Sequence, residues 1–168
     1  MKHFALPLLL LTLLITNTHA QNEKVRAIFV LQLAKYSSWT IDDATKSFVM
    51  TVVGADKVAD ELRSVTKGKT VCGLPIDVYT VKSARNLPKS DIIYLDQKFA
   101  DKTRTVINEQ YGNKTLIIGG QEGMCLNGAQ ISLTDYGNKV GFEWSRYNIK
   151  RGGVKISDKV LNMGRELN

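Results

Sequence analysis

The sequence is poor in the side chains that most enzyme active sites use. Its 168 residues include only two histidines, His3 and His19, and two cysteines, Cys72 and Cys125. Both histidines lie in a segment that has the pattern of a cleaved leader. Without histidine, a mature chain cannot form a Ser-His-Asp or Cys-His catalytic group or a histidine-ligated metal site, and two cysteines cannot complete a structural zinc site. We therefore predict a protein that is not an enzyme and that holds no metal and no cofactor.

The first twenty residues have the pattern of a secretory signal peptide. A short polar start at Lys2 and His3 is followed by an almost unbroken apolar run over 4–15, and 18–20 (Thr-His-Ala) fits a signal peptidase site. The run is too short to span a bilayer with margin, so a cleaved signal is favoured over a membrane anchor. We expect a mature domain of residues 21–168, which is 148 residues (168 minus 20), in an oxidising compartment.

The chain has an excess of positive charge but no pattern typical of nucleic-acid binding. Its formal net charge is +7, and loss of Lys2 with the leader would leave +6. The basic residues are scattered, with a looser cluster between Lys150 and Arg165. A solvated cationic face is the simplest interpretation, and an acidic partner or an anionic membrane surface is the alternative. Without an aromatic stacking pattern, a secreted chain is not expected to bind nucleic acid.

Hydrophobic periodicity predicts alternating helices and strands. We predict helices over 23–37, 56–65, 99–111 and 158–167, the last capped by Ser157, and strands over 48–53, 76–81, 92–95, 116–118, 130–133 and 140–144. The first helix places Val25, Ile28, Phe29, Leu33 and Tyr36 on one face, and its other side is apolar too (Ala27, Val30, Leu31 and Ala34), so we expect the helix to be buried. Three strands (48–53, 92–95 and 116–118) are short apolar runs, as in a parallel sheet covered on both faces, and 135–138 (Asp-Tyr-Gly-Asn) is a hairpin signal. The predicted fold is a single three-layer α/β domain, with a mainly parallel sheet flanked by helices and a late antiparallel hairpin.

A glycine-rich stretch at 117–128 (IIGGQEGMCLNG) surrounds one of the cysteines. Gly123 and Gly128 have the spacing of a phosphate-binding loop, but Ala129 and Gln130 stand where that loop needs Lys and Ser or Thr. A nucleophilic Cys125 would need a neighbouring base, which the chain lacks. The favoured interpretation is a disulfide between Cys72 and Cys125, and two buried free thiols or pairing between chains are the alternatives.

Two long segments resemble a known family. Residues 25–39 (VRAIFVLQLAKYSSW) are similar to the N-terminal helix pattern K-A-x-F-L-x-x-F-A-K-F-x-x-W-P of the YfiR/HmsC-like periplasmic family. Residues 142–144 (FEW) and 150–161 (KRGGVKISDKVL) resemble its closing pattern F-E-I-N followed by K-R-A-G-L-K-I-S-S-K-L-L. The chain departs from these patterns at Thr40, where the family usually has Pro, at Ser145 for Asn, and at Asp91 for a frequent Cys. The last departure indicates a disulfide pattern different from that of its relatives.

The resemblance implies a non-enzymatic periplasmic regulator. The best understood member represses an inner-membrane diguanylate cyclase by binding its periplasmic part, which lowers cyclic-di-GMP output and biofilm formation, and it can act as a dimer and responds to redox state. The expected partner of this chain is thus such a cyclase or another membrane sensor protein, and the resemblance also allows a homodimer. Candidate partner-binding residues are Tyr36, Trp39, Glu143, Trp144, Lys150, Arg151 and Lys155. For the aromatic residues, a place in the core is the alternative; for Glu143 it is a solvated or Arg/Lys-paired strand position, and for the basic residues a solvated charged surface.

A second hypothesis is a periplasmic module that binds or senses a small ligand. Open α/β sheets tend to bind ligands at the carboxyl ends of their strands. The candidate residues at those ends are Gly54, Asp96, Gly119 and Gly120. An enzyme is the least favoured hypothesis, because the carboxylates near strand ends (Asp56, Asp91, Asp96 and Glu143) show no spacing that pairs them.

Overall fold

The computed structural model describes residues 17–136 and 139–167, with side chains from residue 22 onward. The predicted signal peptide therefore falls largely outside the described residues, as does the centre of the predicted hairpin turn. The helical elements are α1 (Asn17–Lys35), α2 (Asp56–Thr66), η2 (Gln97–Lys102), α3 (Thr103–Glu109), η3 (Met124–Asn127), α4 (Arg146–Gly152) and α5 (Asp158–Leu161). The strands are β1 (Ser37–Ser38), β2 (Phe48–Val53), β3 (Thr70–Val71), β4 (Leu74–Val81), β5 (Ile92–Leu95), β6 (Leu116–Gly119), β7 (Ile131–Tyr136), β8 (Lys139–Ser145), β9 (Lys155–Ile156) and β10 (Arg165–Leu167).

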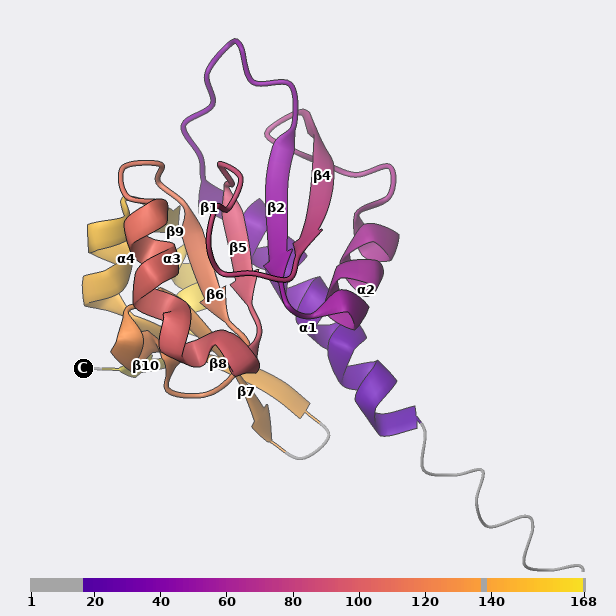
Figure 1. Cartoon of the computed structure of the whole chain (residues 1–168), viewed down its shortest axis with the longest axis vertical. Helices are drawn as coiled ribbons and strands as arrows, with labels where there is room; N and C mark the ends of the chain where they lie inside the picture. Colours follow the sequence, from indigo (N-terminus) through magenta and orange to yellow (C-terminus); the bar gives the residue numbers. More distant parts are fainter. Residues whose placement is uncertain (1–16, 137–138, 168) are drawn as a thin grey trace, which may run out of the picture.

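The core is an eight-stranded, mainly parallel sheet in the order β10-β8-β7-β6-β5-β2-β4-β3 (Figure 1). The pairs β7·β8 and β3·β4 are antiparallel, and the other pairs in this sheet are parallel. β1 and β9 form a separate antiparallel pair. The predicted fold class is therefore confirmed, including the late antiparallel hairpin of β7 and β8.

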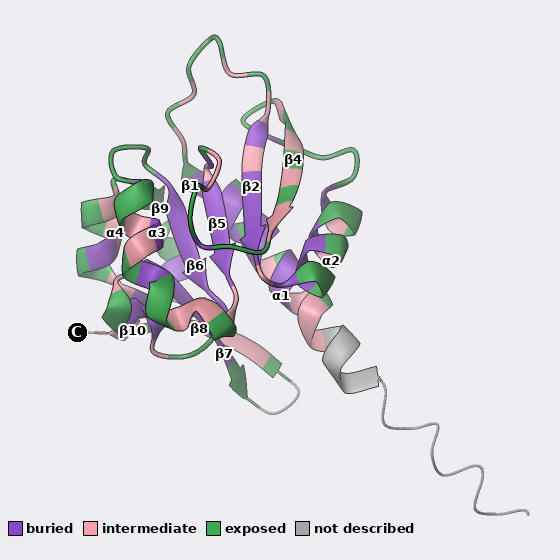
Figure 2. Cartoon of the chain, viewed as in Figure 1, coloured by how far each residue is buried: buried purple, intermediate pink, exposed green. Residues whose placement is uncertain are grey.

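Helices cover both faces of the sheet. Alternate residues of its central strands point to opposite sides, so the two faces belong to two different hydrophobic clusters. On β5, Ile92 and Tyr94 belong to the larger hydrophobic cluster, with α1 and α2, whereas Ile93 and Leu95 belong to the smaller one, with Val106 of α3. Figure 2 shows buried residues along β2, β5 and β6, and exposed residues on the outer sides of α2, α3 and α4. Strands buried on both faces explain why the bounds predicted for β2 and β5 are correct.

α1 is buried on part of its circumference only, whereas the whole helix was predicted to be buried. Ala27, Val30 and Ala34 are fully buried, but Ile28 is 39% and Tyr36 is 45% exposed. The helix is apolar on almost all sides, so its periodicity alone does not distinguish the buried side from the exposed one. The face containing Ile28 and Tyr36 remains open to solvent.

The end of the chain also differs from its prediction. The predicted final helix stops after one turn, at Leu161, and residues 165–167 form β10, which pairs in parallel with β8. Gly164 lies where an added Cβ atom would overlap the ring of Phe142, so the chain passes closely over β8 at this point. The predicted helix over 99–111 is likewise divided into η2 and α3, with non-helical backbone angles at Phe99.

Candidate functional site

An apolar groove lies between α1, β8 and α5. Its volume is about 340 Å³, and its walls include Ile28, Phe29 and Tyr36 from α1, Phe142 from β8, and Met163 just after α5. The rings of Phe29 and Phe142 meet edge to face at 5.8 Å and form part of its wall. We call this surface the α1–α5 groove.

The α1–α5 groove gathers large hydrophobic side chains that face solvent. Met163 is 75% exposed, and Ile28 and Tyr36 are also exposed. Scattered apolar residues are normal on a protein surface, but several around one hollow are typical of an interaction site. Sequence reasoning proposed Tyr36 and missed Ile28 and Met163, because it placed Ile28 in the core and Met163 inside a helix that does not form there.

The other aromatic candidates belong to the interior. Trp39 donates from Nε1 to the carbonyl of Ala34 at 2.7 Å, and its ring packs edge to face on Phe48. Trp144 is 5% exposed and lies in the larger hydrophobic cluster, with the guanidinium of Arg146 5.2 Å from its ring centroid. Trp144 thus packs in the core, and Trp39, which is partly buried, packs against it; contact with the core was the alternative interpretation for both.

Glu143 is buried in a polar network. Its side chain is 1% exposed, accepts a hydrogen bond from the backbone N–H of Gly123, and forms an ion pair with Arg165 at 2.7 Å. Arg165 also pairs with Glu122 at 2.7 Å. Glu143 therefore joins β8, β10 and the glycine-rich segment before η3, instead of facing solvent.

The basic candidates do not form one surface. Lys150 is exposed on α4 and Lys155 is exposed on β9, whereas Arg151 lines a hollow between α3 and α4. Of the seven partner-binding candidates, only Tyr36 lies in the α1–α5 groove. The structure thus brings together a different set of residues from the one that the sequence indicates.

Side chains fill the carboxyl edge of the sheet, where the ligand-binding alternative was predicted. An added Cβ atom would lie 2.5 Å from Met124 at Gly119 and 2.7 Å from the Tyr94 hydroxyl at Gly120, and at Gly54 it would overlap the Phe99 ring. Asp96 caps η2 by accepting a hydrogen bond from the backbone N–H of Lys98. None of these four candidates lines a hollow described for this structure.

Arg26 of α1 is bound at this edge of the sheet through three polar contacts. Its guanidinium donates to the carbonyl of Gly120 at 2.6 Å and to the Tyr94 hydroxyl at 3.1 Å, and it pairs with Asp135 at 2.7 Å. Burial alone would lower the pKa of Arg26, but Tyr94 and Asp135 raise it, so the guanidinium stays charged. Burial also raises the pKa of Tyr94, which therefore stays protonated at neutral pH.

Cys72 and Cys125 are free thiols in the structure, which corrects the predicted disulfide. Cys72 is exposed in the tight turn between β3 and β4, whereas Cys125 is buried in η3, which directly precedes β7. The strand order separates β3 from β6 by four strand spacings, roughly 19 Å. A disulfide requires Cα atoms within about 7 Å, so this fold cannot join the two cysteines.

Cys125 lies in a polar contact with Ser132. The backbone N–H of Cys125 donates to Ser132 Oγ at 2.7 Å, and Ser132 Oγ lies 3.1 Å from Cys125 Sγ. Burial raises the pKa of the Cys125 thiol to about 12, and the Glu143 carboxylate adds to this effect. Such a thiol is protonated and unreactive at neutral pH.

Across the described part of the chain, no three His, Cys, Asp or Glu residues lie close enough together to hold a metal ion. Within the same part, no helix is both long and apolar enough to cross a membrane.

Comparison with solved structures shows what the fold resembles. A conserved domain protein from Vibrio cholerae O1 biovar El Tor strain N16961 has a TM-score of 0.57 and 15% identity, with 84% of this chain and 60% of that chain covered. The ABC domain from Streptococcus pneumonia, solved in complex with L-Trp, has a TM-score of 0.56 and 12% identity, with 89% and 62% covered. The chain thus spans less than two thirds of either neighbour, and at these identities the similarity concerns the fold alone.

Sequence comparison identifies the family. No curated protein matches the chain. Residues 23–165, however, match the family described as YfiR/HmsC-like, and this range includes both segments that resemble its pattern. The match extends over most of the 168 residues, so the chain belongs to the YfiR/HmsC-like family.

Proposed function

We propose that this protein is a periplasmic, non-enzymatic regulator that binds the periplasmic part of an inner-membrane diguanylate cyclase and lowers its output of cyclic-di-GMP. The YfiR/HmsC-like family is a periplasmic, non-catalytic family known for regulating such cyclases. In this proposal the signal peptide is removed before residue 21, and the mature domain acts by protein–protein contact.

The observation that carries the proposal is the α1–α5 groove. Of the eight large hydrophobic residues that are exposed in the described chain, three lie on this one hollow. Apolar and aromatic anchors that enter such pockets supply most of the energy of a protein interface. The groove therefore suits an apolar segment of the partner, and Lys159 adds positive charge to its wall.

A matched pair of tyrosine variants tests this function. Tyr36 in the groove is 45% exposed, and Tyr79 on β4 is 49% exposed, so replacing either one by Glu places the same charge on a similarly open surface. Tyr36→Glu should release the cyclase and raise cellular cyclic-di-GMP to the level of a deletion strain, whereas Tyr79→Glu should behave as the wild type. Both variants must reach the periplasm in equal amounts, measured by immunoblot.

Crosslinking identifies the partner directly. A photo-crosslinking residue in place of Met163 should capture a membrane protein with a GGDEF domain, and the same residue in place of Tyr79 should not. Unchanged cyclic-di-GMP in the deletion strain, together with no captured membrane protein, would contradict the proposed function.

A further inference from the structure

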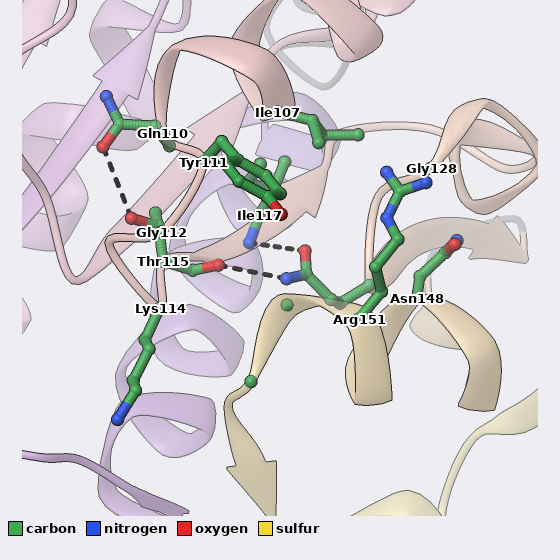
Figure 3. A pocket seen from close by; sticks show the side chains of 13 residues that line it. Ile107, Gln110, Tyr111, Gly112, Lys114, Thr115, Ile117, Gly128, Asn148 and Arg151 are labelled. Carbon is green, nitrogen blue, oxygen red and sulfur yellow. Dashed lines mark hydrogen bonds between the residues drawn. The ribbon is translucent and has the colours of Figure 1, made fainter.

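A hollow between α3 and α4 is distinct from the α1–α5 groove. One part, of about 290 Å³, is shown in Figure 3, and an adjoining part has a volume of about 640 Å³. The two parts share Ile107 of α3, Gly128 after η3, and Asn148 and Arg151 of α4. We call the two together the α3–α4 hollow.

The walls of the α3–α4 hollow are fixed by buried amides. Gln130 is 4% exposed, accepts a hydrogen bond from the N–H of Ile117 at 2.9 Å, and donates to the carbonyl of Thr115 at 3.0 Å (Figure 3). Asn148 is 8% exposed and donates to the carbonyls of Cys125 and Ala129. Because these side chains bind backbone groups on separate elements, the hollow keeps its shape without a ligand.

Glycines let these walls approach one another. At Gly128, whose φ is 107°, an added Cβ atom would lie 2.6 Å from Ile107 and 3.7 Å from Arg151 Nη2. At Gly152 it would overlap the side-chain amide of Gln130. A larger residue at either position would clash with the opposite wall, so the close approach of the walls depends on glycine.

The charge of the α3–α4 hollow is positive and uncompensated. Arg104 and Arg151 line it, and neither forms an ion pair with any residue that the structure describes. The segments 110–121, 123–134 and 144–157, which supply most of its walls, contain no Asp or Glu. The carboxylate at the end of α3, Glu109, accepts a hydrogen bond from the backbone N–H of Leu87 and does not line the hollow.

The Arg151 side chain lies along the wall of the hollow (Figure 3). Figure 3 shows the Arg151 guanidinium beside Gly128, whereas the Lys114 side chain extends away, toward its hydrogen bond with Thr40 at 3.3 Å. Arg151 also lies 6.0 Å from the ring centroid of Tyr147, which limits its freedom. Guanidinium groups bind carboxylate and phosphate oxygens through paired hydrogen bonds, and a concave wall strengthens the attraction.

We propose that the α3–α4 hollow is a binding site for a small molecule that carries an oxyanion, either a phosphate or a carboxylate, held by Arg104 and Arg151. This site goes beyond the proposed function, because it needs no protein partner and shares no residue with the α1–α5 groove.

The test is a titration of the mature protein, alone, with inorganic phosphate and with acetate at constant ionic strength, followed by the backbone amide NMR signals of Gly128, Gly152 and Gly153. We expect saturable shifts at these glycines with at least one of the two anions, and none with chloride. The anion that binds more tightly then identifies the phosphate or the carboxylate class.

Two double variants that remove the same charge, one inside the hollow and one elsewhere, test whether the two arginines bind the anion. The double variant Arg104→Gln, Arg151→Gln should weaken binding at least tenfold, and Lys57→Gln, Arg85→Gln, which changes the charge equally at exposed positions elsewhere, should not. Shifts that do not saturate, or equal losses in the two double variants, would overturn the proposal. Because no cyclase is present, such a failure would leave the proposed function unaffected.

Discussion

The carboxylate of Glu143 lies 2.7 Å from the guanidinium of Arg165, and the two residues face each other in the parallel register of β8 and β10. Their environments differ, because the side chain of Glu143 is 1% exposed and that of Arg165 is 55% exposed. A carboxylate this deep in the protein needs strong partners to offset its loss of hydration. The pair therefore fixes the last strand of the described chain to the sheet.

Replacing Glu143 by Gln should destabilise the protein markedly. The variant loses the ion pair and weakens a buried hydrogen bond from Gly123, so we expect the free energy of unfolding to fall by about 2 kcal/mol and Tm by roughly 4–8 °C. Urea denaturation measures this change. Glu122→Gln is the control, because Glu122 binds the same Arg165 while 61% exposed, and its loss should leave stability unchanged. Equal effects of the two variants would show that the burial of Glu143 is irrelevant.

The two thiols should differ sharply in reactivity. Cys72 is exposed, whereas Cys125 is buried with its pKa raised to about 12, so only about one Cys125 in 10⁴ is a thiolate at pH 8. A maleimide should label one thiol per native molecule within minutes and the second only after unfolding. The Cys72→Ser variant should therefore show almost no labelling when folded. Rapid labelling of that variant would contradict the buried position of Cys125.

The same thiol should make stability depend on pH in the alkaline range. Burial raises the pKa of Cys125 from 9.0 to about 12, so the folded state keeps a proton that the unfolded state releases, and stability falls as pH rises above about 9. Between pH 9 and 11 this effect should cost about 2 kcal/mol. Urea denaturation of Cys72→Ser with and without Cys125→Ala, both under reducing conditions, isolates it, because the lysines and tyrosines are common to both proteins. Identical pH slopes would show that Cys125 is not the cause.

A disulfide can be introduced where the fold allows it. Ser132 Oγ lies 3.1 Å from Cys125 Sγ, so Ser132→Cys in a Cys72→Ser background should form a bridge with little backbone movement. Closing this short loop should stabilise the oxidised form over its reduced form by about 2 kcal/mol. Intact mass, lower by two units on oxidation, and Tm with and without reductant measure the result. A protein that remains reduced in mild oxidant would show that the two Cβ atoms do not meet the geometry of a disulfide.

The sequence is sufficient to predict the strands that have both faces buried. The predicted bounds of β2 and β5 are correct because such strands are almost entirely apolar, with Thr51 the one small polar residue in β2, and are followed by Gly54 and Asp96. β10 could not be predicted in this way. Residues 165–167 form a strand only because β8, about twenty residues earlier, offers an open edge, and local periodicity carries no information about that edge.

The candidate site was harder to predict than the fold. A hydrophobic pattern shows that Tyr36 and Trp39 are large and apolar, but only the packing shows that one faces solvent and the other contacts Phe48. An even number of cysteines likewise suggests a bridge, whereas the order of the strands decides whether the two can meet. Exposure and distance between segments are properties of the whole fold.

Arg26 sets the rotation of α1 about its own axis. Each residue turns a helix by about 100°, so Ile28 lies about 200° from Arg26, nearly on the opposite side. The three acceptors of Arg26 come from Tyr94, Gly120 and Asp135, and a helix rotated by one residue would lose all of them together. The buried contacts of one guanidinium therefore fix the orientation of α1. That orientation in turn determines which hydrophobic side chains of α1 are exposed to solvent.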